Sequence, residues 1–226
     1  MSIKIAIDGP VAAGKTTTAK ALAKDLGFLY VDTGALYRGV ALYLLRNKLG
    51  PADCTDTFML GISLGMAHDE AGQKTILNGE DVTEYIRTPE VSKMASDCSA
   101  VQAVRDRLLR VQTDICRSND VVMEGRDIGT MILPDADVKF YLTADVLARA
   151  QRRFAEDRSR WPAVKQDPAK LLADLMERDA NDRNRQHGPT AVAPDAVVID
   201  NTNMRFRETV DLLRHIVDVR LSGGAQ

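Results

Sequence analysis

One segment near the start of the chain constrains the fold more than any other. Residues 9–16 read Gly-Pro-Val-Ala-Ala-Gly-Lys-Thr and fit the pattern G-x-x-x-x-G-K-[ST]. The apolar run at residues 3–7 predicts a buried strand before it, and a helical pattern follows it, which is the setting that this motif requires. There the glycines let backbone N–H groups and the helix N-terminus surround phosphate oxygens. A plain glycine-containing turn is the alternative, and the flanking strand and helix argue against it.

Two residues of this phosphate loop carry the expected chemistry. Lys15 would reach the β- and γ-phosphates of a nucleoside triphosphate, and the hydroxyl of Thr16 would bind Mg²⁺. Nine residues are expected to hold the triphosphate: Gly9, Pro10, Val11, Ala12, Ala13, Gly14, Lys15, Thr16 and Thr17. The motif predicts the ligand and leaves open what the chain does with it.

Five short runs rich in Val, Ile and Leu predict the strands of one sheet. They lie at residues 3–7, 28–31, 121–123, 138–142 and 196–199. Helical patterns separate several of these runs, and the clearest is an apolar stripe at three- and four-residue steps through residues 101–115. Alternating strands and helices favour an α/β fold with a parallel sheet flanked by helices. We expect a single domain over residues 1–226.

Two segments interrupt this alternation and are expected to be insertions. Between about residues 53 and 88, a short helix is followed by residues 74–82, where Asn78-Gly79 between apolar residues predicts a hairpin. Residues 149–185 hold eight arginines but only two lysines. A solvated helical face would explain such a charge run. The excess of arginine instead favours phosphate contacts, because a planar guanidinium fits phosphate oxygens better than an ammonium group does.

The overall composition excludes several other classes of protein. With 30 Lys and Arg against 32 Asp and Glu, the formal charge of −2 argues against a nucleic-acid partner. No apolar run approaches the roughly 18 residues of a membrane span, so no membrane partner is expected. The three cysteines, Cys54, Cys98 and Cys116, predict neither a disulfide framework nor a zinc site. We therefore expect a cytoplasmic protein.

Charged residues directly follow two of the predicted strands. Asp32-Thr33-Gly34-Ala35-Leu36-Tyr37-Arg38 follows the second strand, and Glu124-Gly125-Arg126-Asp127-Ile128-Gly129-Thr130 follows the third. The carboxyl ends of parallel strands share one edge of a sheet with the phosphate loop, so Arg38, Arg126 and Asp127 should converge on a bound nucleotide. Each residue taken alone would fit an ordinary salt bridge in a loop.

These motifs together resemble the bacterial cytidylate kinases. The phosphate loop, the two loops after the strands and the segment Glu177-Arg178-Asp179-Ala180-Asn181-Asp182-Arg183-Asn184-Arg185 carry the resemblance, and residues 86–91 and 133–137 extend it over almost the whole chain. It implies a nucleoside monophosphate kinase with a P-loop kinase fold, a five-stranded parallel sheet, a monophosphate-binding insertion and an arginine-rich lid. It also implies transfer of the γ-phosphate of ATP to CMP or dCMP with Mg²⁺.

The resemblance assigns the substrate-binding residues. It places the cytosine against Ser96, Arg105 and Asp127, the acceptor phosphate against Arg38, Arg126 and Arg185, and the sugar against Arg178 and Asp182, with Thr33 beside them. The chemistry agrees, because a carboxylate can accept from the N4 amine of cytosine while an arginine donates to N3 and O2. Arg178, Asp182 and Arg185 also fit a plain intrahelical ion-pair ladder.

The sequence departs from the family pattern at the metal site. Thr16 is followed by Thr17 where the family often has Gly and then Thr, so either hydroxyl is a candidate metal ligand. Glu124 stands where many members have Asp.

The mechanism expected from these residues is direct in-line transfer, with Lys15, Arg126 and Arg185 as catalytic residues and no general base, because the acceptor is already an ionised phosphate. Within the lid, further contributors are expected among five arginines that the sequence does not rank: Arg149, Arg152, Arg153, Arg158 and Arg160. The expected partners are the small-molecule substrates alone, bound by a monomer. Two alternatives remain: a P-loop kinase of another small acceptor, and a nucleotide-gated regulatory protein.

Overall fold

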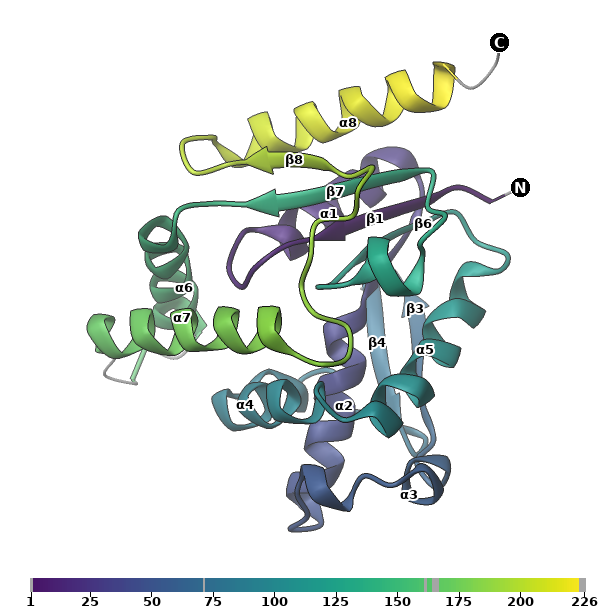
Figure 1. The fold of residues 1–226 in the computed structure, drawn as a ribbon, viewed down its shortest axis with the longest axis vertical. Helices are drawn as coiled ribbons and strands as arrows, with labels where there is room; N and C mark the ends of the chain where they lie inside the picture. Colours follow the sequence, from purple (N-terminus) through teal and green to yellow (C-terminus); the bar gives the residue numbers. More distant parts are fainter. Residues whose placement is uncertain (1, 71, 161, 164–166, 224–226) are drawn as a thin grey trace.

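A parallel sheet organises the molecule. The computed structural model describes residues 2–70, 72–160, 162–163 and 167–223. Among these residues, five parallel strands form the main sheet in the order β2-β6-β1-β7-β8 (Figure 1), namely β1 (Lys4–Asp8), β2 (Leu29–Asp32), β6 (Val121–Glu124), β7 (Val138–Thr143) and β8 (Val197–Asp200). All five predicted strands are confirmed, each within one or two residues. The phosphate loop follows β1, the central strand.

Helices cover both faces of this sheet. Ile5 and Ile7 of β1 face α1 (Lys15–Leu26) and α8 (Phe206–Gly223), which contribute Leu22 and Leu213 to the same buried cluster. Ala6, whose side chain points the other way, lies in a second cluster beneath a π-helical turn (Ile128–Ile132) and the end of α5 (Gln102–Cys116). Burial on both faces explains why the strands read as continuous apolar runs. The predicted helix over residues 101–115 is confirmed as α5.

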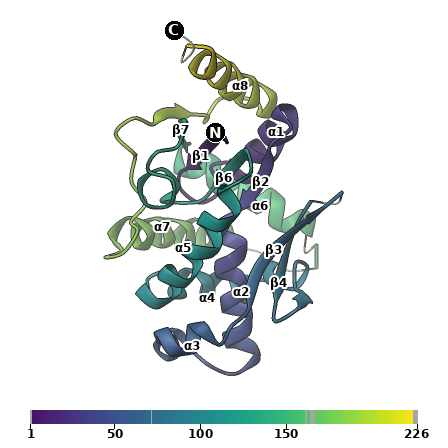
Figure 2. The same ribbon diagram turned by 90° about the vertical axis from the view of Figure 1, so that its right-hand side faces the viewer.

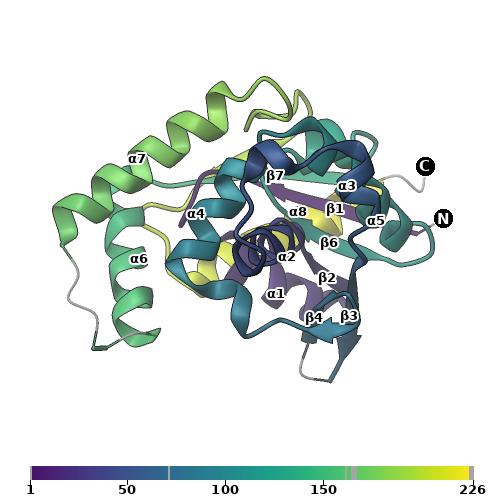
Figure 3. The same ribbon diagram turned by 90° about the horizontal axis from the view of Figure 1, so that it is seen from below.

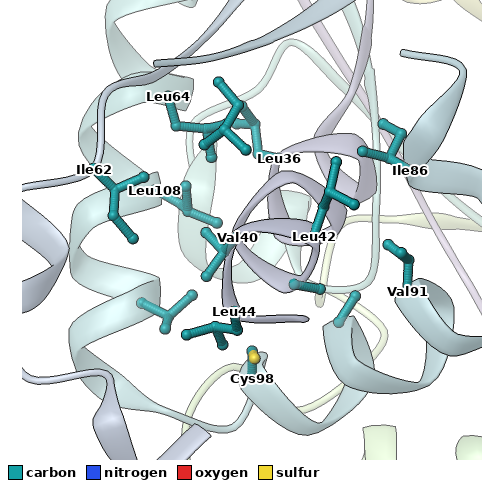
Figure 4. Packing of buried hydrophobic residues seen from close by; sticks show 14 of the residues in the cluster. Leu36, Val40, Leu42, Leu44, Ile62, Leu64, Ile86, Val91, Cys98 and Leu108 are labelled. Carbon is teal, nitrogen blue, oxygen red and sulfur yellow. The ribbon is translucent and has the colours of Figure 1, made fainter. Parts of the chain in front are cut away.

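The largest cluster of buried side chains surrounds α2 (Thr33–Arg46). Leu36, Val40 and Leu44 of this helix pack against α4 (Pro89–Cys98) and α5 (Figure 4). Viewed from below, α2 lies at the centre with the other two helices around it (Figure 3). The side chain of Asp32 begins α2 by accepting a hydrogen bond from the backbone N–H of Ala35 at 3.1 Å. The end of β2 and the start of α2 are thereby fixed against each other.

A small antiparallel sheet lies beside α2 (Figure 2). The chain passes through a 3₁₀ turn (Pro51–Asp53), α3 (Asp56–Leu60), β3 (Leu64–Asp69), β4 (Gly72–Leu77), β5 (Glu80–Asp81) and a second 3₁₀ turn (Tyr85–Arg87). Asn78 and Gly79 join β4 to β5 with φ values of 50° and 85°, so the predicted hairpin is confirmed. The sequence interpretation missed β3, because its residues include no β-branched side chain to mark a strand.

Two long helices form the arginine-rich segment. α6 (Val146–Arg160) and α7 (Pro168–Asn184) lie together at the end of the sheet toward which β7 and β8 point (Figure 1). Asp167 begins α7 by accepting from the backbone N–H groups of Ala169 and Lys170, and Pro168 is the first residue of the helix. Residues 161 and 164–166 of this segment lie outside the described residues. In the described part of the chain, no helix has the length and apolar character needed to cross a membrane.

Candidate active site

The loop between β1 and α1 has the backbone shape of an anion cradle. Gly9 has φ of 145°, and a Cβ atom there would lie 2.0 Å from the carbonyl oxygen of Leu142. Gly14, the residue before α1, has φ of 87°, and Ala12 has φ of 59°. Left-handed residues in a loop before a helix are typical of backbone segments whose N–H groups surround an anion. Of the nine predicted triphosphate-binding residues, Gly9 to Gly14 therefore precede the helix N-terminus, and Lys15, Thr16 and Thr17 are the first residues of α1.

Lys15 is held inside this loop. Its ammonium nitrogen Nζ donates to the carbonyl oxygen of Pro10 at 2.7 Å, and the side chain is buried. Burial, together with the nearby positive charge of Arg126, lowers the pKa of Lys15 to about 7. A phosphate group in the cradle would supply the negative charge that this ammonium group lacks, and would favour its charged form.

Thr16 and Thr17, the two candidate metal ligands, point to different partners. The Thr16 hydroxyl donates to the Glu124 carboxylate at 2.5 Å, and the Tyr30 hydroxyl donates to the same oxygen at 3.0 Å. The Thr17 hydroxyl instead donates to the backbone carbonyl of Gly14 at 2.9 Å. Burial raises the pKa of Glu124, and the negative charge of Asp32 adds to the shift. The oxygens of Thr16 and Glu124 are hard donors that could together hold Mg²⁺, whereas the Thr17 hydroxyl faces a backbone carbonyl.

Asp8 is a charged residue of this region that the sequence analysis missed. It ends β1, and its two carboxylate oxygens accept from the backbone N–H groups of Ile128 and Gly129, each at 2.8 Å. Burial raises the pKa of Asp8 to about 6 against the opposing effect of these hydrogen bonds. A carboxylate at the end of an apolar strand was the signal that could have identified it. Asp8 ties the phosphate loop to the loop that carries Arg126 and Asp127.

Arg38 lies on α2 one turn from the helix start. Its Nη2 atom donates to Asp32 at 2.7 Å, and Arg87 approaches the same carboxylate oxygen at 3.8 Å. Burial of Asp32 opposes its ionisation, but the two arginines outweigh that effect and hold the pKa of Asp32 below its usual range. The Nε atom of Arg38 is buried without a hydrogen-bond partner among the described residues. Thr33, next to Asp32, donates to the backbone carbonyl of Glu124 at 2.8 Å.

The three residues expected to meet the base lie on α4, α5 and the loop after β6. Arg105 of α5 forms a buried ion pair with Asp127, stacks 6.0 Å from the ring centre of Tyr37, and donates to the backbone carbonyl of Ser99 at 3.2 Å. Ser96 lies on the adjacent α4 and borders the same pocket. An arginine and a carboxylate held side by side present a donor and an acceptor to one edge of a ligand.

α7 contributes a second group of charged residues. Asp182 accepts from the Nε atom of Arg126 at 2.9 Å and from the Nη2 atom of Arg185 at 2.9 Å. Arg178 faces the same pocket one turn earlier, and no hydrogen bond to its guanidinium is present among the described residues. Burial and the nearby Arg126 lower the pKa of Arg178 to about 10. Arg126 and Arg185 each form an ion pair with Asp182, whereas Arg178 forms none among the described residues. The positive charge of Arg178 is therefore the least compensated of the three.

The arginines of α6 differ in their surroundings. Arg149 is buried, donating to Asp179 at 2.6 Å and to the backbone carbonyl of Val11 in the phosphate loop at 2.9 Å. Arg152 donates to the side chain of Asn201 at 2.9 Å. Arg153 and Arg160 border the pocket and contact Glu156. Arg158 is exposed and does not border the pocket as described. Arg149, which does not border the pocket as described, therefore supports the phosphate loop through its contact with the Val11 backbone.

A single pocket of about 590 Å³ joins these groups. All nine predicted substrate-binding residues border it, as do Val11, Ala12, Gly14, Lys15, Thr16 and Thr17 of the predicted loop residues, whereas Gly9, Pro10 and Ala13 do not. The residues that border the pocket include eleven Lys and Arg against five Asp and Glu, an excess of six positive charges in a chain whose net charge is −2. Such a pocket suits a ligand with several anionic groups.

The fold and the pocket define the class of protein. A parallel sheet with a phosphate loop after its central strand, a lysine inside that loop and a basic pocket beside it are the features of a P-loop kinase. A solved structure of an uncharacterized protein from Eubacterium ventriosum shares the fold, with a TM-score of 0.53, 14% sequence identity, and coverage of 96% of this chain and 99% of that chain.

Sequence comparison identifies the family. The model of the cytidylate kinase family matches residues 5–218. A cytidylate kinase of Caldicellulosiruptor bescii is 43% identical over 210 residues, covering 92% of each chain. One of Solibacter usitatus is 44% identical over 223 residues, covering 98% of this chain and 95% of the relative. The chain belongs to the cytidylate kinase family.

Proposed function

We propose that the chain transfers the γ-phosphoryl group of ATP to CMP or dCMP, giving ADP and CDP or dCDP. One observation carries this proposal. The same pocket holds the phosphate loop with Lys15 on one side and the buried Arg105–Asp127 pair on the other. A triphosphate in the cradle and a pyrimidine nucleotide at the ion pair would share one enclosed space, as direct transfer requires.

Base selection follows from the donors and acceptors at the second site. Asp127 would accept from the exocyclic N4 amine of cytosine, while Arg105 would donate to N3 and O2, with Ser96 beside them. Uracil carries a carbonyl where cytosine has the amine and a donor at N3, so the same pair would meet it with unmatched polar groups. Each buried mismatch costs about 1–3 kcal/mol, which corresponds to roughly tenfold discrimination or more.

The remaining arginines would hold the acceptor phosphate. Arg38, Arg126 and Arg185 would neutralise it, because two anionic phosphates must approach each other against their repulsion. We assign Arg178 and Asp182 to the sugar side, and Thr33 to the edge of the acceptor site. The unpartnered guanidinium of Arg178 and the unpartnered Nε atoms of Arg38 and Arg185 support these assignments, since buried donors of this kind are satisfied by a ligand.

Transfer would be in line, without a covalent intermediate or a dedicated base. The acceptor oxygen is already largely ionised at neutral pH, so positioning and charge neutralisation suffice. Lys15 would stabilise charge on the transferred group, with Arg126 and Arg185 on the acceptor side. Thr16 and Glu124 would hold Mg²⁺, which supplies further neutralisation of the phosphate oxygens.

Two segments would complete the site around the substrates. Residues 53–88 would serve as the monophosphate-binding insertion of a single domain, and residues 149–185 as a lid that closes over both nucleotides and excludes water. We expect the active unit to be a monomer, and size-exclusion chromatography tests this. The three cysteines are free thiols, which supports a reducing compartment such as the cytoplasm.

An ADP-release assay with ATP and Mg²⁺ tests the function. We expect turnover with CMP and dCMP, and at least tenfold lower kcat/KM with UMP and AMP. Equal rates with AMP and CMP would remove base recognition and favour a kinase of another acceptor. ATP binding without acceptor-dependent ADP release would favour a nucleotide-gated regulatory protein.

A further inference from the structure

The recognition residues of the acceptor side form a closed ring. Arg105 contacts Asp127, the next residue after Arg126, and Arg126 contacts Asp182. Asp182 contacts Arg185, and both Arg185 and Arg105 donate to Ser99. Ser99 is thus the only uncharged member of the ring, and the sequence analysis assigned it no function. It stands directly after α4 and is buried.

Ser99 contacts three recognition residues through two of its atoms, the hydroxyl oxygen and the backbone carbonyl oxygen. Its hydroxyl accepts from the Nη1 atom of Arg185 at 2.6 Å and donates to the backbone carbonyl of Ser96 at 2.6 Å. Its own backbone carbonyl accepts from the Nη1 atom of Arg105 at 3.2 Å. A hydroxyl has one hydrogen, so donation to Ser96 leaves only lone pairs to face Arg185. The orientation of this hydroxyl is therefore fixed before any ligand binds.

We propose that Ser99 is a positioning residue that couples recognition of the base to placement of the arginine that holds the acceptor phosphate. This inference rests on the proposed function, because the ring has this meaning only if a nucleoside monophosphate lies within it. Arg105 lies on α5 and Arg185 directly follows α7, and within the ring both contact Ser99. A base that fixes Arg105 and Asp127 would also fix the Ser99 carbonyl that Arg105 contacts. The Ser99 hydroxyl would then stay in the position in which it accepts from Arg185.

The hydroxyl also limits the freedom of Arg185. The Nε atom of this arginine has no hydrogen-bond partner among the described residues, so its guanidinium is held by Ser99 at Nη1 and by Asp182 at Nη2. Removal of the hydroxyl would leave Nη1 unpaired in a buried position and let the group rotate about its contact with Asp182. The acceptor phosphate would then meet an arginine that is less well ordered, whereas the phosphate loop would be unaffected.

Ser99→Ala, Ser99→Thr and Ser92→Ala test the positioning function. We expect Ser99→Ala to raise KM for CMP roughly three- to tenfold, with KM for ATP within about twofold of wild type. Ser99→Thr should restore KM for CMP because it keeps the hydroxyl. Ser92→Ala, on α4 and at the same pocket but outside the ring, should match wild type. An unchanged KM for CMP in Ser99→Ala, or an equal rise for both substrates, would overturn the proposal.

A double-mutant cycle tests the coupling itself. Ser99→Ala and Asp127→Asn are measured singly and together as kcat/KM for CMP. We expect the double variant to lose less than the product of the two single losses, because either change already breaks the ring. A loss equal to that product would refute coupling. Wild-type protein that shows no CMP-dependent ADP release would instead refute the proposed function, so the two failures are distinguishable. Thermal unfolding of each variant verifies that it is folded.

Discussion

At the scale of single residues, Lys15 is the side chain with the most direct function in the proposed reaction. Its ammonium group now contacts only the carbonyl of Pro10 by hydrogen bond among the described residues, and a bound phosphate would replace that contact. Its neighbour Lys20 also borders the pocket but lies 5.4 Å from the ring centre of Tyr30. Lys15 and Lys20 both lie on α1, but within the described part of the chain only Lys15 contacts the phosphate loop. Lys20 therefore provides a matched control for a substitution of Lys15.

We expect Lys15→Met to lower kcat by about three orders of magnitude or more, because it removes a preorganised positive charge from the transferred group. The fold should persist, since Met fills the same buried space without the cost of desolvating a charge. Lys20→Met should stay within a fewfold of wild type. The measurement is steady-state ADP release, with far-UV circular dichroism as the control for folding. Wild-type turnover in Lys15→Met would refute the function assigned to the phosphate loop.

Asp8 predicts a pH dependence of stability. Its pKa rises from 3.8 in the unfolded chain to about 6 in the folded protein, so the folded state binds the proton more tightly. Between these two values stability falls as pH rises, by about 3 kcal/mol for a shift of this size. Asp8→Asn removes this titration. The free energy of unfolding of Asp8→Asn minus that of wild type should therefore shift in favour of the variant between pH 4 and pH 7.

Urea unfolding of both proteins at the two pH values measures this difference. Asp211→Asn, a change of an exposed carboxylate on α8, is the control. A difference that is the same at both pH values would show that the Asp8 carboxyl does not titrate in this range. Asp8→Asn should also weaken CMP binding, because the amide group offers one oxygen to the two backbone N–H groups that the carboxylate now satisfies.

At the scale of elements, side chains join the small sheet to the main one. The side-chain amide of Gln73 on β4 pairs with the backbone of Asp32, accepting from its N–H at 2.6 Å and donating to its carbonyl at 3.1 Å. His68, opposite Gln73 on β3, contacts the backbone carbonyl of Tyr30 at 3.0 Å. These contacts occupy the free edge of β2, where another strand would otherwise pair. They also hold Asp32, the carboxylate that orients Arg38.

We expect Gln73→Ala to raise KM for CMP roughly three- to tenfold and to leave KM for ATP nearly unchanged. The physical reason is that Asp32 loses both backbone partners at this edge, so the arginine that it holds becomes less ordered. Gln102→Ala, a change of an exposed glutamine at the start of α5, serves as the matched control. Steady-state kinetics with each substrate varied in turn measures both constants. A parallel rise in both KM values would indicate a general loss of folding.

The same elements show what local sequence can and cannot predict. The turn at Asn78-Gly79 was predictable because two successive left-handed residues favour this pair. β3 was not predictable, because Gly65, Met66 and Ala67 carry no strand preference and the strand exists only through its pairing with β4. The contacts of Asp8, Gln73 and Ser99 likewise join residues far apart in the chain, and no local pattern marks them. The resemblance to a family identified many of the residues that border the pocket, but it gave no function to Ser99, which borders it, or to Asp8 and Gln73, which do not.

At the scale of the whole molecule, the fold concentrates positive charge around the pocket, although the chain as a whole is slightly negative. The net charge of −2 was evident from composition, but the excess of six positive charges around the pocket follows only from the fold. α7 and the residue after it bring Arg178 and Arg185 to the loop after β6, and α2 brings Arg38 to the same pocket. Mutual repulsion among these half-buried guanidinium groups opposes folding, and an anion in the pocket would relieve it.

This arrangement predicts that a small polyanion stabilises the protein even without a base. Pyrophosphate at ten times its Kd should add about 1.4 kcal/mol to the free energy of unfolding, which for a chain of this length raises Tm by roughly 3–6 °C. Thermal unfolding in pyrophosphate is compared with sodium chloride at equal ionic strength, so that general screening cancels. Arg178→Gln should reduce the rise in Tm, since it removes the least compensated charge, whereas Arg207→Gln on the exposed start of α8 should not. An equal response to both salts would show that the positive charges of the pocket do not act together on an anion.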